Sequence, residues 1–173
     1  DDNRHMFNRG HWKQLEDTAS GPDVASKKDG KPVINVAGAD EKSFTTDFLA
    51  DKTIDFIKAN KDKKFCFMVS IPDPHGPDSV RAPYKSMFQN KIFTEPRTYN
   101  VKASDAPAWG PPEDEFENMA EYYGMVKCID DNVGKIIEAL RGNKLIDNTI
   151  IVFTADHGDL RGEHGRQDKG QPF

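Results

Sequence analysis

The chain has 173 residues, enough for one α/β domain, since compact domains usually run about 100–150 residues. Its 24 Lys and Arg against 29 Asp and Glu give a net charge of −5 with histidine neutral. This balance argues against nucleic-acid binding, because phosphate contacts need a clustered positive surface. The longest apolar run, Phe65 to Ile71, is far shorter than the ~20 residues of a membrane-spanning helix, so no membrane span is predicted.

The first half of the chain predicts a loop followed by a helix. Residues 1–42 are polar and interrupted by glycine and proline, which predicts mostly surface loop. From Ser43 to Asn60 an amphipathic helix is expected, with Ser43 or Thr45 as its cap. The side chains that share its apolar face are Phe48, Leu49, Thr53, Phe56 and Ile57.

Two apolar runs without polar alternation, Phe65–Ile71 and Thr149–Thr154, are typical of strands buried on both faces. Between them, residues 72–112 form a proline-rich connection, and Glu113–Arg141 has the period of a helix, with Gly142 as its C-cap. Strand, helix and strand in this order predict a right-handed crossover with parallel strands, hence an α/β fold.

The two cysteines, Cys66 and Cys128, lie in apolar or helical patterns and lack the spacing of a zinc site. We therefore expect two buried free thiols. A single disulfide between them is the alternative.

Polar side chains follow both predicted strands. Asp73 and His75 come after the first strand, and Asp156 and His157 come after the second. Because ligands bind at the carboxyl ends of strands in open α/β sheets, these side chains are expected to face one cleft. The glycine-rich segment 162–170 follows directly and adds Glu163, His164 and Lys169.

These residue types can bind a metal ion, transfer a proton or neutralise an anion. Asp156 and His157 offer oxygen and nitrogen ligands to a divalent ion, although an Asp-His-Gly turn is also an ordinary capping feature. His75, held between prolines, can donate a proton or stabilise an oxyanion. Lys169 can neutralise a tetrahedral anion. Each of these side chains, taken alone, has a solvated surface role as its simpler interpretation.

Taken in chain order, four segments resemble the type I sulfatase family of the alkaline phosphatase superfamily. They are Thr45–Ile57, Phe67–His75, Tyr122–Gly134 and Asn148–Gly170, which together cover roughly residues 43–170. The opening Asn3–Trp12 also resembles a segment of secreted bacterial members.

The resemblance implies an alkaline-phosphatase-like α/β fold, a mostly parallel sheet with helices on both faces. Residues 43–173 would be part of its catalytic domain, and residues 1–42 a loop-rich polar segment of the same domain. Asp156 and His157 would bind the active-site divalent ion, usually calcium, with manganese or zinc as alternatives because His157 stands where some sulfatases have asparagine. His75 and Lys169 would contact the sulfate ester as catalytic residues, and His164 would be a substrate-side residue.

The sequence also departs from the family pattern. The family nucleophile is a formylglycine made from Cys or Ser within Cys/Ser-x-Pro/Ala-x-Arg, and neither Cys66 nor Cys128 stands in that motif. The chain starts at Asp1 without an initiator methionine, so we expect an internal piece of a longer protein whose N-terminal part carries the formylglycine. Residues 1–173 alone are then expected to be inactive.

The leading hypothesis is a periplasmic or secreted enzyme that hydrolyses sulfate esters, with a sulfated carbohydrate or other sulfated small molecule as substrate. One alternative is a phosphodiesterase or phosphonate monoester hydrolase of the same superfamily. Another is a non-catalytic carbohydrate-binding relative.

Overall fold

The structure is a computed structural model that describes residues 25–28, 31–34, 36, 39–76, 78–99, 119–165 and 169. The chain divides into two compact units. The first comprises residues 1–89 and 120–149, and the second comprises residues 90–119 and 150–173. Among the helices of the described residues, none has the length and apolar content needed to cross a bilayer.

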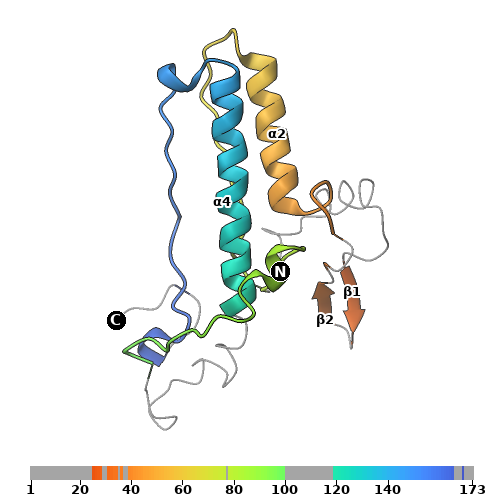
Figure 1. Cartoon of the computed structure of the whole chain (residues 1–173), viewed down its shortest axis with the longest axis vertical. Helices are drawn as coiled ribbons and strands as arrows, with labels where there is room; N and C mark the ends of the chain where they lie inside the picture. Colours follow the sequence, from red (N-terminus) through yellow and green to blue (C-terminus); the bar gives the residue numbers. More distant parts are fainter. Residues whose placement is uncertain are drawn as a thin grey trace. The chain divides into compact units, whose positions relative to one another are not determined.

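A short antiparallel hairpin lies within the segment predicted to be mostly loop. Strand β1 (Ala25–Lys28) pairs with β2 (Lys31–Ile34), with Lys28 opposite Lys31 (Figure 1). Two residues therefore separate the strands, and the sequence places Asp29 and Gly30 there. An Asp-Gly pair between two short runs is a sequence signal of a hairpin, and the prediction of mostly loop, made from polar composition, did not use it. Residues 1–24 lie outside the described part of the chain.

Helix α2 (Thr45–Asn60) confirms the helix predicted from residue 43 to residue 60. The predicted cap by Ser43 or Thr45 is wrong, because Phe44 holds the N-cap position and makes no capping hydrogen bond. The Ser43 hydroxyl instead donates to Asp40 at 2.8 Å, and Thr45 already lies inside the helix. Of the predicted apolar face, Thr53 and Ile57 are buried. The helix also buries polar side chains in its first turn, Thr45, Thr46 and Asp47.

Helix α4 (Met119–Gly142) confirms most of the second predicted helix, whose first residues, 113–118, lie outside the described residues. It does not end with Gly142 as its cap. The backbone N–H of Leu145 donates to Leu140 at 2.9 Å, and that of Lys144 donates to Arg141 at 2.9 Å. This pair of bonds is a Schellman motif with Lys144 in the left-handed position, at φ 58°.

The core of the first unit gathers where α4 meets the loops around residues 36–44 and 80–84. Its buried members are Val36, Phe44, Val80, Tyr84, Met125 and Cys128. The buried residues of α4 are Gly124, Met125, Cys128, Asn132 and Leu140, whereas the apolar side chains of Tyr123 and Val126 are 41% and 40% exposed. Gly124 allows close packing, because a Cβ there would lie 2.7 Å from the carbonyl oxygen of Tyr84 in α3 (Tyr84–Met87).

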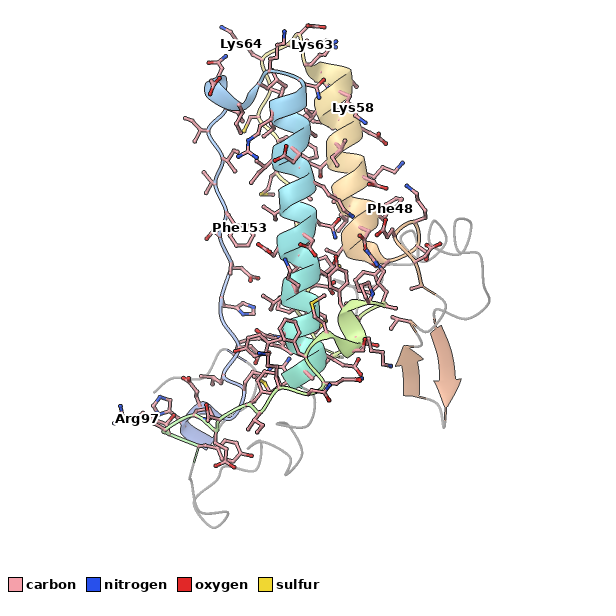
Figure 2. All side chains as sticks on the ribbon, viewed as in Figure 1. Phe48, Lys58, Lys63, Lys64, Arg97 and Phe153 are labelled. Atoms are coloured by element: carbon pink, nitrogen blue, oxygen red, sulfur yellow. The ribbon has the colours of Figure 1, made fainter. Side chains whose placement is uncertain are left out.

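Neither segment predicted as a buried strand forms one. Within the described residues, the strand pairing is limited to β1 and β2, so the predicted parallel sheet is absent from this part of the chain. Met68 is 87% exposed, and Phe153 is 74% exposed and projects from the segment that follows α4 (Figure 2). An apolar run becomes a strand buried on both faces only where neighbouring strands pair with it, and the described residues supply no such neighbours.

The first apolar run packs on α2 instead. The ring of Phe56 stacks on that of Phe67 at 4.2 Å and meets that of Phe65 edge-on at 5.5 Å. Cys66 in the same run is a free but exposed thiol, which corrects its predicted burial. Cys128 is free and buried, as predicted.

Candidate functional site

The predicted site residues fall in both units. Asp73 and His75 belong to the first unit, whereas Asp156, His157, His164 and Lys169 belong to the second. The convergence of all six on one cleft stays a prediction.

His75 lies in a tight turn. Its backbone N–H donates to the carbonyl oxygen of Pro72 at 3.2 Å. Its ring Nδ1 lies 2.8 Å from the carbonyl oxygen of Gly76, and because a carbonyl only accepts hydrogen bonds, Nδ1 carries a proton in this contact. The imidazole is exposed. When the ring is protonated, Nε2 is the nitrogen placed to donate to a ligand.

Asp73 is tied to the beginning of α2. The hydroxyl of Thr46 donates a hydrogen bond to Asp73 Oδ2. Burial raises the pKa of Asp73 to about 6, and the neighbouring carboxylate of Asp47 acts in the same direction. The Thr46 hydrogen bond and the charge of His75 act in the opposite direction, toward a lower pKa. Asp73 therefore changes its charge near pH 6.

A buried ion pair next to this turn is the feature that sequence reasoning missed. The carboxylate of Asp47 accepts two hydrogen bonds from Arg81, from Nε at 2.7 Å and from Nη2 at 2.8 Å. Asn132 and Lys135 of α4 donate to Asp47 Oδ1 at 3.1 and 3.2 Å. Asp47 is 1% exposed and Arg81 is 3% exposed. These partners are 34 to 88 residues away in sequence, so local patterns carry no signal for them.

The electrostatics of this pair follow from its geometry. Burial opposes the charge of Asp47, but hydrogen bonds from Arg81 and Asn132 outweigh burial and hold the pKa of Asp47 below its ordinary value. The hydrogen bond to Asp47 raises the pKa of Arg81. Burial, with help from the Asp47 charge, raises the pKa of the Cys128 thiol to about 12. Cys128 is thus a neutral core residue rather than a nucleophile.

In the second unit, Asp156 and His157 face each other. Asp156 Oδ1 accepts the backbone N–H of the adjacent residue His157 at 2.9 Å. The His157 ring places Nδ1 2.9 Å from the carbonyl oxygen of Gly158 and Nε2 3.5 Å from Asp156 Oδ2. Nδ1 therefore carries the proton, and in the neutral ring Nε2 presents its lone pair beside the carboxylate.

This pair fits part of a metal site. Calcium takes oxygen ligands at about 2.3–2.6 Å, which the Asp156 carboxylate offers, and a second donor atom 3.5 Å away, bound at a similar distance, would meet the same ion at roughly a right angle. The same pair of atoms also suits manganese or zinc, which accept imidazole nitrogen. No group of three or more His, Cys, Asp and Glu suited to a metal occurs among the residues that the structure describes.

The loop after this pair carries the remaining predicted residues. Arg161, Gly162 and His164 all have positive φ, at 45°, 87° and 55°. The backbone N–H of His164 donates to the hydroxyl of Thr98 at 3.0 Å, which fixes this part of the loop. Left-handed backbone in non-glycine residues is costly and is found most often where the surrounding structure or a function requires it. Lys169 is partly buried.

Comparisons with known proteins agree with the motifs. A sequence profile of the sulfatase family matches residues 6–173. The arylsulfatase of Clostridium perfringens is 28% identical over 157 residues, covering 79% of this chain and 31% of that protein. The iduronate 2-sulfatase of Mus musculus is 33% identical over 105 residues, covering 59% of this chain and 18% of that protein.

The structure is also similar to that of yidJ from Bacteroides fragilis, a protein assigned to the sulfatases. The TM-score is 0.60 at 30% sequence identity, and the match covers 79% of this chain and 28% of that chain. The chain therefore spans less than a third of the length of these relatives. Since the profile match extends over nearly the whole sequence, the chain belongs to the sulfatase family.

Proposed function

We propose that the complete protein hydrolyses sulfate esters in a metal-dependent reaction. Membership of the sulfatase family over residues 6–173 is the observation that carries this proposal. A sulfated carbohydrate is the substrate class we favour, because the similar proteins include an enzyme named for a sulfated sugar, the iduronate 2-sulfatase of Mus musculus. On the family resemblance alone, we further propose that the protein acts in the periplasm or outside the cell.

In this proposal His75 and Lys169 are the catalytic residues of the chain. Lys169 offsets the negative charge that builds on the sulfuryl oxygens as the ester S–O bond breaks. His75 donates a proton from its imidazolium to the leaving oxygen, which would otherwise depart as an alkoxide. His164 contacts the part of the substrate beyond the sulfate group. The strained loop around it gives a defined place for that contact.

Asp156 and His157 hold the divalent ion, which we propose to be calcium. The support is the carboxylate of Asp156, an oxygen ligand of the kind that calcium prefers, with His157 Nε2 3.5 Å from its Oδ2 as a second donor. A bound divalent cation supplies positive charge against the sulfuryl oxygens. The nucleophile comes from a Cys/Ser-x-Pro/Ala-x-Arg segment elsewhere in the complete protein, since residues 1–173 do not contain that motif.

The test is hydrolysis by the purified product of the complete reading frame. An aryl sulfate and a sulfated sugar are compared with a phosphodiester, each with and without chelator. We expect sulfate release that chelator abolishes and added calcium restores. Faster cleavage of the phosphodiester would favour the phosphodiesterase alternative. Binding of the sulfated sugar without hydrolysis, unchanged by chelator and by Lys169→Ala, would favour a non-catalytic relative.

A further inference from the structure

We propose that Thr46 and Asp73 are positioning residues for His75. They hold the turn 72–76 against the first turn of α2, so that the imidazole keeps a fixed place beside the sulfate ester. This inference rests on the role proposed above for His75. Thr46 and Asp73 act in it through His75 and do not themselves contact the substrate.

The contacts form a short path from the helix to the ring. The Thr46 side chain is fully buried at 0% exposure, and its hydroxyl donates to the Asp73 carboxylate 27 residues further along the chain. Asp73 lies inside the turn that the His75 N–H closes on Pro72 at 3.2 Å. The His75 ring is held in turn by the Nδ1 contact to Gly76 at 2.8 Å. Loss of the first contact therefore frees the turn that carries the ring.

The anchor on the helix is rigid because of its neighbour. Asp47 follows Thr46 directly and is fixed by Arg81 and by the two donors on α4. Of these two adjacent side chains of α2, Thr46 thus binds the turn 72–76, and Asp47 binds the core of the unit. A turn attached to such a point moves little, which is what a proton donor requires, because misplacement by about 1 Å costs a catalytic group much of its rate.

The chemistry of Asp73 favours a functional reason for its presence. Burial raises the pKa of this carboxyl to about 6, so its charged form is unfavourable in the fold. The charged and titratable groups close enough to influence it are Asp47 on α2, Cys128 on α4 and His75 in its own turn. A merely structural position is filled at less cost by an uncharged side chain.

The experiment compares two threonines of one helix in the complete gene product. Thr46→Val removes the hydroxyl with little change of shape, and Thr46→Ser restores it. Thr53→Val is the matched control, because Thr53 is also buried, at 4% exposure, and its hydroxyl donates within α2, to the carbonyl oxygen of Leu49 at 2.8 Å. The rate of sulfate ester hydrolysis and the hydrogen exchange of the peptide containing residues 72–76 are measured for each variant.

We expect Thr46→Val to lower kcat about tenfold with KM changed less than twofold, and to speed exchange of the His75 turn about tenfold. Thr46→Ser and Thr53→Val should stay within about threefold of the unchanged protein in both measurements. Equal behaviour of Thr46→Val and Thr53→Val would overturn the inference. If the unchanged protein hydrolyses no sulfate ester, the proposed function fails, and the exchange comparison still decides whether Thr46 holds the turn.

Discussion

We expect the buried ion pair between Asp47 and Arg81 to contribute strongly to the stability of the first unit. Asp47→Asn keeps the size of the side chain but removes the charge that neutralises Arg81, which is only 3% exposed. Glu41 lies 3.7 Å from Arg81 but is 69% exposed, so it cannot replace a buried counterion. Leaving one partner of a buried pair without its counterion typically costs about 3–5 kcal/mol. At 1.36 kcal/mol per factor of ten, the hydrogen-bonded amides in the interior of α2 should exchange between roughly a hundredfold and a few thousandfold faster.

The assay is hydrogen exchange by mass spectrometry on the complete gene product, with Asp130→Asn as the control. Asp130 is 73% exposed and pairs with Lys127 on the surface of α4, so its charge contributes little to the fold. We expect the control to exchange like the unchanged protein. Acceleration of less than tenfold in Asp47→Asn would refute the reasoning, because it would mean that water or the Glu41 carboxylate compensates the charge of Arg81 just as well.

Three further predictions concern the same unit, each read from thermal unfolding. Gly124→Ala should destabilise the unit by about 1–2 kcal/mol, because the new Cβ meets the Tyr84 carbonyl oxygen. Gly134→Ala on the same helix has open space around it and should stabilise the unit by about 0.5–1 kcal/mol. A change of stability in the same direction for both variants would contradict the packing. Burial raises the pKa of Asp73 to about 6 in the fold, above its ordinary value of 3.8. Asp73 therefore favours folding below about pH 4 and loses that contribution, up to about 3 kcal/mol, as the pH rises from there through 6. Asp73→Asn should abolish this loss, and an unchanged profile would contradict the burial. Lys144→Gly should stabilise the end of α4 by about 0.5–1 kcal/mol, because Lys144 has a φ of 58°, and destabilisation would argue against that backbone.

The sequence predicts the two long helices well, because a 3.6-residue period is a local property. It assigns their buried faces less well. The apolar side chains at helical spacing include Tyr123 and Val126, which are exposed. The core instead contains Gly124, which allows close approach of the backbone of Tyr84, and Asn132, whose side chain donates a hydrogen bond to Asp47. The predicted strands failed for a different reason. Burial of an apolar run depends on neighbouring strands, and the run itself carries no information about whether they are present.

The candidate site shows the same division. The pairing of Asp156 with His157 is local, and the structure brings their side chains together as adjacent residues allow. The contact between Thr46 and Asp73 joins residues far apart in sequence, and in a helix pattern Thr46 and Asp47 look like ordinary polar positions of a first turn. A carboxylate at the start of a helix is usually explained by its favourable interaction with the helix dipole. For that reason Asp47 gives no sign in the sequence of its buried partner Arg81. Only the tertiary structure reveals such a contact.

The most direct test of the proposed chemistry is the release of inorganic sulfate from a sulfated sugar by the complete gene product, compared between the unchanged protein and His75→Ala. If His75 protonates the leaving oxygen, the variant should keep its affinity for the sugar and lose at least about a hundredfold in kcat, in line with general acid catalysis. The loss should be smaller with an activated aryl sulfate, whose leaving group needs no proton. Equal losses on both substrates, or none on the sugar, would contradict the role assigned to His75.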